Sequence, residues 1–279
     1  MRALILAVAL LLPALPAWAR DVWFTTSDGA RLHYTETGPR HAPLTLVFVP
    51  GWTMPGWIFA PQQAFFQRHY RVVLFDPRGQ GRSEITAQGY DQTRRGADLA
   101  ELIARLPGRV VVVGWSLGVL DTLAFIHQGG NDRVAGLVLV DNSVGERPAP
   151  AYQPPPPGPP PPYPVFVRAF VAGMFHTRQS PAYLARLTRA CLRLPPPDAA
   201  SLLAYPVPRT YWKAALLSTA LPVLYVVRPQ WAAQAHNLVA DRPHTDIAIF
   251  PRAGHALFID EASRFDALVQ QFLERDIRS

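Results

Sequence analysis

The sequence predicts an α/β fold in which helices flank a mostly parallel sheet of eight strands. Two observations indicate this class. The chain has 279 residues, 49% of them hydrophobic, which suits one large α/β domain, or two small ones, with a substantial core. Apolar runs of strand length alternate along the chain with segments whose apolar residues have helical spacing. Such alternation is typical of strands joined through helices in a parallel sheet.

The expected strands start with a hairpin, because an Asp-Gly pair in the turn at 27–30 favours a tight connection. Strands are expected at 21–25, 31–37, 44–49, 70–75, 109–113, 134–140, 221–227 and 246–250. Helices are expected at 61–68, 97–104, 119–126 and 260–273. Four shorter helices, punctuated by proline, are expected at 165–175, 180–194, 197–205 and 208–217.

The segment Gly114-Trp115-Ser116-Leu117-Gly118 lies between a buried strand and a helix. A strand that turns abruptly into a helix strains the backbone of the middle residue and exposes its side chain at the carboxyl edge of the sheet. Only small residues two positions to either side let strand and helix come so close, which explains Gly114 and Gly118. Ser116 is therefore a candidate nucleophile, although an ordinary glycine-rich turn would give the same local pattern.

Three further segments occur in a fixed order around this turn. They are Gly51-Trp52, Asp76-Pro77-Arg78-Gly79-Gln80-Gly81-Arg82-Ser83 and Gly254-His255. Together with 114–118 they resemble the α/β-hydrolase superfamily, and within it the single-domain esterases and cofactor-free haloperoxidases that carry a small helical cap. The resemblance spans about Val22 to Phe272. It implies an α/β-hydrolase fold with the cap inserted between strands six and seven.

The resemblance also implies roles for individual residues. A serine hydroxyl is scarcely ionised at neutral pH and needs a base within hydrogen-bond reach. His255 lies in the loop after the last strand, where the family carries this histidine. The backbone N–H groups of Trp52 and Leu117 correspond to the family's oxyanion donors. Pro50 stands where relatives have a histidine, but backbone donors survive a change of side chain.

Three interpretations are open for the carboxylate that would orient His255. Most relatives carry it after strand seven, but the segment 227–234 has no carboxylate and the next one is Asp241. Some relatives carry it after strand six, where Asp141 stands, and the order Ser116, Asp141, His255 is that of the family. Asp141 is therefore the predicted acid, with Asp241 and a dyad without an acid as the alternatives.

The predicted organisation has three parts. A short positive end, an apolar run and an Ala-x-Ala site make 1–19 a secretory signal peptide cut after Ala19. We therefore expect an exported protein, periplasmic or secreted, with no stable membrane anchor after cleavage. Residues 20–144 and 220–279 form the hydrolase core, and 145–219 form a proline-rich linker and the helical cap.

Composition and motifs argue against several classes of partner. The net charge is +7, but its arginines are scattered singly along most of the chain, so no nucleic-acid partner is predicted. The sequence has no zinc-like spacing of Cys and His, no phosphate-cradling loop and no dinucleotide motif, so neither metal nor cofactor is predicted. The single cysteine, Cys191, cannot form an internal disulfide and is expected to pack in the interior.

The leading hypothesis is an exported serine hydrolase that cleaves a small or medium carboxylic ester through an acyl-enzyme on Ser116, with His255 as the base. A serine at this turn argues against the relatives that use an aspartate there, the haloalkane dehalogenases and epoxide hydrolases. The same triad would serve acyl transfer, perhydrolysis, amide hydrolysis or C–C cleavage. A third hypothesis is a non-catalytic hydrolase fold that binds a ligand.

Overall fold

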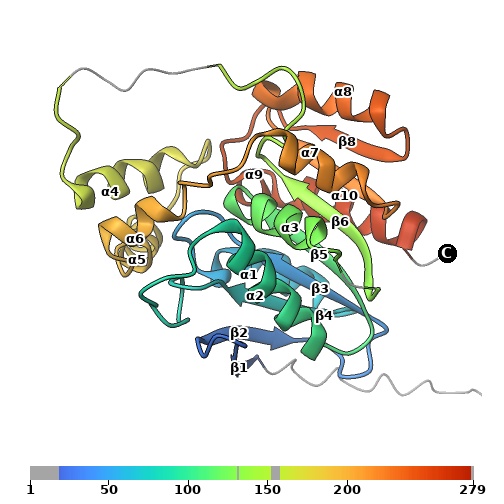
Figure 1. Ribbon diagram of the computed structural model, residues 1–279, viewed down its shortest axis with the longest axis horizontal. Coiled ribbons are helices and arrows are strands. Elements are labelled where there is room, and N and C mark those ends of the chain that lie inside the picture. Colours follow the sequence, from blue (N-terminus) through green and yellow to red (C-terminus); the bar gives the residue numbers. More distant parts are fainter. Residues whose placement is uncertain (1–18, 131, 152–157, 278–279) are drawn as a thin grey trace, which may run out of the picture.

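The computed structural model describes residues 19–130, 132–151 and 158–277. Its centre is an eight-stranded sheet in the order β1-β2-β4-β3-β5-β6-β7-β8 (Figure 1). β2 runs antiparallel to β1 and β4, and all other neighbouring strands are parallel, so the predicted fold class is confirmed. The strands are β1 (Arg20–Thr25), β2 (Arg31–Thr37), β3 (Leu44–Val49), β4 (Arg71–Asp76), β5 (Arg109–Trp115), β6 (Val134–Val140), β7 (Val223–Val227) and β8 (Thr245–Ile249).

The helices between and after these strands mostly lie close to their expected positions. They are α1 (Ala60–Phe66), α2 (Gln92–Arg105), α3 (Leu117–His127), α4 (Tyr163–Gly173), α5 (Pro181–Cys191), α6 (Pro196–Ser201), α7 (Thr210–Leu217), α8 (Ala232–Asp241), α9 (Leu257–Asp260) and α10 (Ala262–Phe272). The short helical turns η1 (Gly56–Phe59), η2 (Pro229–Trp231) and η3 (Leu273–Ile277) accompany them.

Four helices differ from the expectation. α2 begins five residues early, because the side chain of Asp91 accepts hydrogen bonds from the amides of Thr93 and Arg94 and so caps the helix there. α8 was not expected at all. The helix expected at 260–273 corresponds to α10, which begins two residues late because the backbone of Glu261 leaves helical geometry, and the short helix α9 before it was not expected.

Both faces of the sheet are buried, as the nearly continuous apolar runs of its parallel strands require. Side chains along a strand point alternately to opposite faces. In β3, Leu46 and Phe48 belong to one hydrophobic cluster, while Val47 and Val49 belong to the other. Residues of α1 and α10 join the first cluster, and residues of α2, α7 and α8 join the second. The sheet therefore has a helical layer on each side.

The segment between β6 and β7 places α4, α5 and α6 beside the sheet, at the left of Figure 1. Buried residues of these three helices, Val167, Leu187 and Ala199, join the first hydrophobic cluster. α7 also falls within the predicted insertion 145–219, but it packs against α3 and its Trp212 belongs to the second cluster. The division of the chain into core and cap stays a prediction.

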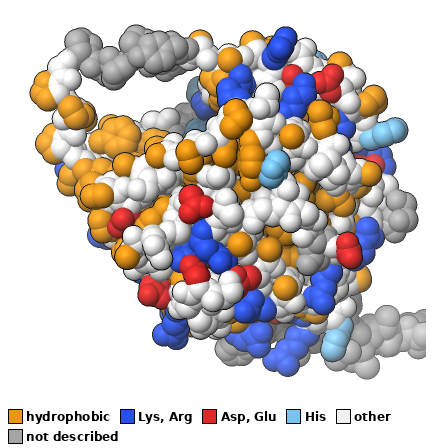
Figure 2. Space-filling view, viewed as in Figure 1, with side chains coloured by type: hydrophobic (Ala, Val, Ile, Leu, Met, Phe, Trp, Pro, Cys, Tyr) orange, Lys and Arg blue, Asp and Glu red, His pale blue; other side chains and the backbone are white. Residues whose placement is uncertain are grey.

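The surface view in Figure 2 shows hydrophobic side chains gathered over α4, while Lys and Arg side chains lie at separate places on the same face. Residues 1–18, which hold most of the expected signal peptide, and residues 152–157 of the expected linker lie outside the described residues. Within the described ranges, no helix combines the length and the apolar character needed to cross a membrane.

Candidate active site

Ser116 lies in the sharp turn between β5 and α3. Its backbone angles, φ 54° and ψ −118°, belong to a region that side-chain-bearing residues rarely adopt. A Cβ on Gly114 would lie 2.7 Å from Oγ1 of Thr122. A Cβ on Gly118 would collide with the carbonyl oxygen of Val49. Strand and helix can therefore approach this closely only with glycine at both positions, which is the physical reason for the motif.

Three of the predicted site residues meet at the carboxyl edge of the sheet. Nε2 of His255 lies 2.8 Å from Oγ of Ser116, and Nδ1 of the same ring lies 2.6 Å from Oδ2 of Asp141. Asp141 directly follows β6, and His255 lies in the loop between β8 and α9. The imidazole is placed to take a proton from the hydroxyl while the carboxylate holds its other nitrogen.

The alternative acid, Asp241, lies elsewhere, at the end of α8. Its carboxylate is 2.5 Å from Nζ of Lys213, whose hydrogen bond lowers the pKa of Asp241. Lys213 also lies 2.8 Å from the carboxylate of Glu146. Asp241 thus belongs to a surface ion pair and does not approach His255 in this arrangement.

The carboxylate of Asp141 has two further donors, both from Arg228. The backbone N–H of Arg228 donates to Oδ1 (3.0 Å), and its Nε donates to Oδ2 (2.6 Å). Because the Asp141 side chain is fully buried, these donors and His255 compensate a charge that water does not reach. Sequence reasoning missed Arg228; the signal available was the segment 227–234, which lacks the expected carboxylate and carries this arginine instead.

Two contacts fix the loop that carries His255. Nε1 of Trp115 donates to the carbonyl oxygen of His255 (2.8 Å). The carboxylate of Asp260 accepts hydrogen bonds from the amides of Gly254 (2.8 Å), His176 (2.8 Å) and Thr177 (2.9 Å). Burial alone would raise the pKa of Asp260, but these hydrogen bonds outweigh it and the pKa lies below its usual value. The His255 loop is therefore tied both to β5 and to the segment after α4.

The loop after β3 lies against the nucleophile, since a Cβ on Gly51 would be 3.0 Å from Cβ of Ser116. Nε2 of Gln80 donates to the carbonyl oxygens of Gly51 (2.9 Å) and Met54 (2.8 Å), and these two hydrogen bonds hold the loop in place. Leu117 is the first residue of α3, so its N–H has no acceptor one turn earlier in the helix. The assignment of the Trp52 and Leu117 amides as oxyanion donors stays a prediction.

A buried chain of polar groups supports this loop. Nη2 of Arg95 donates to Oε1 of Gln80 (3.2 Å) and pairs with Oδ2 of Asp121 (2.5 Å). The hydroxyl of Tyr205 donates to Oδ1 of Asp121 (3.0 Å). Burial, together with the Asp121 charge, raises the pKa of Tyr205 well above its usual value, so this hydroxyl stays a donor. Sequence reasoning missed this network, because its members come from segments far apart in the chain.

Comparison with known proteins identifies the family. The sequence model described as the alpha/beta hydrolase family matches residues 46–269, which is most of the chain. The chain belongs to this family. A non-heme chloroperoxidase from Streptomyces lividans is 38% identical over 118 residues, so the match spans only 42% of this chain and 42% of that relative.

Two further matches cover most of this alpha/beta hydrolase. A pimeloyl-[acyl-carrier protein] methyl ester esterase from Vibrio parahaemolyticus is 26% identical over 250 residues, 82% of this chain and 94% of that one. The crystal structure of a bromoperoxidase from Bacillus anthracis has a TM-score of 0.77 at 18% identity, and the match covers 91% of this chain and 100% of that one. The structural likeness supports the fold.

Helices α4 and α6 of this alpha/beta hydrolase, which were expected in the cap, pack next to the loop that follows β3. Nε1 of Trp52 donates to the carbonyl oxygen of Ala199 in α6 (2.6 Å). The Trp52 ring meets the rings of Phe166 and Phe170 of α4 edge-on, with centroids 5.9 and 5.2 Å apart. A residue predicted to stabilise the oxyanion therefore also contacts both helices.

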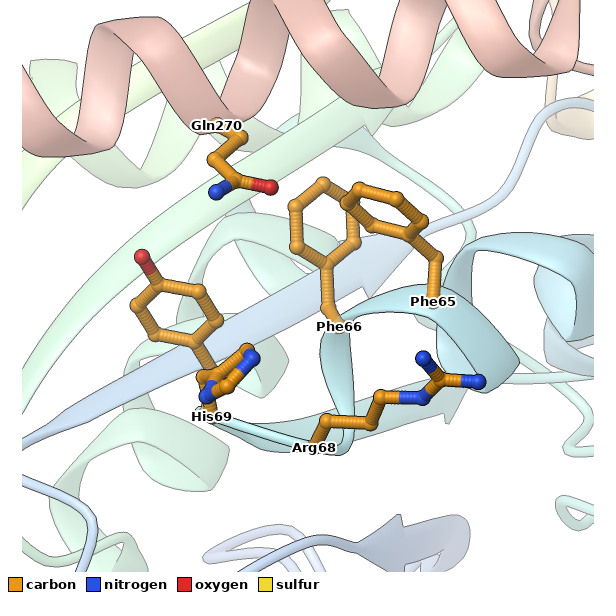
Figure 3. A pocket seen from close by; sticks show the side chains of 6 residues that line it. Phe65, Phe66, Arg68, His69 and Gln270 are labelled. Carbon is orange, nitrogen blue, oxygen red and sulfur yellow. The ribbon is translucent and has the colours of Figure 1, made fainter.

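Other features of the hydrolase lie apart from Ser116. Figure 3 shows a pocket between α1 and α10, lined by Phe65, Phe66, Arg68, His69, Tyr70 and Gln270, and none of these is a predicted site residue.

Cys191 is buried next to Met54, and burial raises the pKa of its thiol to about 11, in keeping with a packing role. Over the described residues, no group of three or more His, Cys, Asp or Glu side chains could hold a metal ion.

Proposed function

We propose that this protein is a serine hydrolase that cleaves small or medium carboxylic esters. The observation that carries the proposal is the continuous line of hydrogen-bonding atoms from Ser116 through His255 to Asp141, with contacts of 2.8 and 2.6 Å. No movement is needed to bring nucleophile, base and acid together. The strained turn at Ser116 is the second support, because such strain persists where function requires it.

The reaction follows from this geometry. Ser116 Oγ attacks the ester carbonyl while Nε2 of His255 takes its proton, and Asp141 stabilises the imidazolium that forms. The amides of Trp52 and Leu117 bind the oxyanion of the tetrahedral intermediate. His255 then gives the proton to the leaving alcohol, and the acyl group remains on Ser116. Water, deprotonated by His255, attacks the acyl-enzyme and releases the acid.

The ester class is supported by the name of a relative matched over most of its length, a methyl ester esterase. The aromatic wall of Trp52, Phe166 and Phe170 suits an apolar acyl or alcohol group. The name of a bifunctional esterase/perhydrolase from Acinetobacter calcoaceticus, which is 34% identical over 120 residues, favours a second candidate, perhydrolysis, in which hydrogen peroxide replaces water and a peroxy acid leaves. The same acyl-enzyme serves both reactions.

Labelling with a fluorophosphonate probe tests the proposal, since the probe reacts covalently with an activated serine. We expect one labelled site, lost in Ser116→Ala, and hydrolysis of short-chain aryl esters with kcat reduced on the order of a millionfold in that variant. Labelling that persists in Ser116→Ala would contradict the assignment. A folded wild-type protein that neither reacts with the probe nor hydrolyses esters, amides, thioesters or diketones would favour the non-catalytic hypothesis.

Export is a separate part of the proposal and rests on the sequence of 1–19. Expression of the full chain in a Gram-negative host, followed by fractionation, tests it. The expected result is a periplasmic or secreted product whose N-terminal residue is Arg20. A product that stays in the cytoplasm and begins at residue 1 or 2 would exclude the signal peptide.

A further inference from the structure

Arg228 occupies the place in the fold from which the acid of a related triad would come. It directly follows β7, and the resemblance places the acid after that strand. β6 and β7 are neighbours in the sheet, so residues that follow them emerge side by side. The acid here follows β6, and the residue after β7 donates two hydrogen bonds to it.

We propose that Arg228 is a positioning residue of the triad, which holds the carboxylate of Asp141 correctly aimed at His255. The inference rests on the proposed function. Two donors from one residue reach both oxygens of the carboxylate, Oδ1 through the amide and Oδ2 through Nε. The rotation of the carboxyl plane is thereby fixed, and Oδ2 is left facing Nδ1 of His255 at 2.6 Å.

The side chain of Arg228 supplies what the backbone amide does not, a compensating positive charge. A fully buried carboxylate with no cation nearby is costly, and in its neutral form it would hold an imidazolium poorly. Nε of Arg228 lies 2.6 Å from Oδ2, a distance typical of a strong charge-assisted hydrogen bond. An arginine keeps its charge at any working pH, which makes it suited to this place.

An opposing effect also follows from the geometry. Nη2 of Arg228 lies 3.4 Å from Nδ1 of His255, and both nitrogens carry protons in the working tautomer. The guanidinium therefore repels the imidazolium that forms during attack. Among the described residues, the His255 ring makes polar side-chain contacts with Asp141, Arg228 and Ser116, so the repulsion by Arg228 and the attraction by Asp141 act on it together. If charge repulsion dominated, removal of the guanidinium would raise the rate; if positioning dominates, it lowers the rate.

The test compares Arg228→Met, which keeps the length of the side chain but removes the charge and the Nε donor, with Arg252→Met. Arg252 is exposed in the loop that follows β8 and serves as the matched control. For ester hydrolysis we expect kcat to fall about tenfold to hundredfold in Arg228→Met, with KM changed by less than about twofold. Arg252→Met should match the wild type. An unchanged or increased kcat in Arg228→Met would overturn the proposal.

A double-mutant cycle with Asp141→Asn separates positioning from a general loss of structure. If Arg228 acts through the carboxylate, Arg228→Met should cost less than about twofold in the Asp141→Asn background. If the losses of kcat in the two single variants multiplied in the double variant, Arg228 would not act through Asp141. Because the side chain of Arg228 is 25% exposed, ethylguanidinium in solution should also restore part of the activity of Arg228→Ala and none of the activity of Asp141→Asn.

Nitrogen-15 NMR of the His255 ring gives a readout that does not need turnover. The wild type should show the proton on Nδ1, and Arg228→Met should show a mixture of tautomers, with the signals assigned through His255→Gln. A protein without esterase activity but with this change in tautomer would refute the proposed function and leave the positioning role standing. If the protein is active but Arg228→Met changes neither the His255 tautomer nor kcat, the proposed function stands and the positioning role of Arg228 is refuted.

Discussion

At the scale of single residues, backbone strain gathers around Ser116. In the part of the chain that the structure describes, the non-glycine residues with positive φ are Thr53 (57°), Ser116 (54°) and Asp141 (51°). Each such residue costs about 1–3 kcal/mol and persists only where its surroundings fix it. Nδ2 of Asn142 donates to the carbonyl oxygen of Ser116 (2.9 Å), which is one such restraint. Ser116 and Asp141, two residues of the predicted triad, and Thr53 in the loop after β3 therefore all carry backbone strain.

Asp141→Asn tests which carboxylate orients His255. An asparagine keeps the shape but offers no negative charge and favours the wrong tautomer of the ring, so kcat should fall by about 10⁴-fold. Asp241→Asn is the matched control, because Asp241 is exposed and pairs with Lys213. Steady-state ester hydrolysis measures both variants. A large loss in Asp241→Asn, with Asp141→Asn nearly unaffected, would reverse the assignment.

The site residues that belong to local sequence motifs could be predicted from the sequence. Ser116 stands in a five-residue motif and His255 follows the last strand, so both were named in advance. The choice between Asp141 and Asp241 stayed open, because the strand that delivers the acid depends on which strands are neighbours, and a single sequence does not encode that pairing explicitly. Arg228 was missed for the same reason: its partners come from other strand ends, those of β6 and β8.

At the scale of the elements, the short helix α9 joins the loop that carries His255 to the segment after α4. Asp260 at its end accepts from Gly254 in the His255 loop and from His176 and Thr177 after α4. The amides that follow α4 and an amide of the His255 loop thus share a single carboxylate. This junction appeared in the sequence only as the start of one long helix, since hydrophobic spacing does not reveal a change of direction within it.

Asp260→Ala should therefore weaken both the fold and the placement of His255. The partly exposed carboxylate and its hydrogen bonds should be worth about 1–2 kcal/mol in the free energy of unfolding. Because the pKa of Asp260 is lowered in the folded state, this contribution is present above the unfolded pKa and is lost as pH falls through the folded value. Urea denaturation at pH 7 and pH 3 measures it. Asp246→Ala is the control, since Asp246 pairs with Arg275 at the surface. If Asp260→Ala lowered the free energy of unfolding by the same amount at both pH values, the stabilisation would not depend on the charge of Asp260.

At the scale of the whole molecule, two arginines form buried ion pairs inside the fold. Arg78 is buried and pairs with Asp98 and Asp28, and Arg95 is buried against Asp121. Planar guanidinium groups suit such buried bidentate pairs. Length and periodicity predicted the sheet and its helical layers well, because they depend on hydrophobic burial. The buried ion pairs, which join α2 to α3 and to the loop after β4, depend on partners distant in sequence and were not foreseen.

The contact between α1 and α10 gives the whole fold a distinct pH dependence. Asp266 of α10 is buried and accepts a hydrogen bond from Nε2 of Gln62 (3.1 Å), which also donates to the carbonyl oxygen of Phe258 (2.8 Å). Burial raises the pKa of Asp266 to about 6, and the hydrogen bond from Gln62 only partly opposes this. The folded state therefore binds the proton more tightly than the unfolded chain, so Asp266 lowers the free energy of unfolding as pH rises from about 4 to above 6.

Asp266→Asn removes that penalty while keeping an acceptor for Gln62. At pH 8 the variant should be more stable than the wild type by about 1–2 kcal/mol, and at pH 4, where Asp266 is largely protonated in the folded state, the gain should vanish. Urea denaturation at both pH values provides the comparison. The control is Asp246→Asn, because the Asp246 side chain is exposed at the surface, and it should change the stability at neither pH. A gain of equal size at the two pH values would mean that packing, and not ionisation, separates the variant from the wild type. Since α1 and α10 cover the sheet face opposite α3, ester hydrolysis by Asp266→Asn should remain that of the wild type at 25 °C, and only its loss on heating at pH 8 should slow.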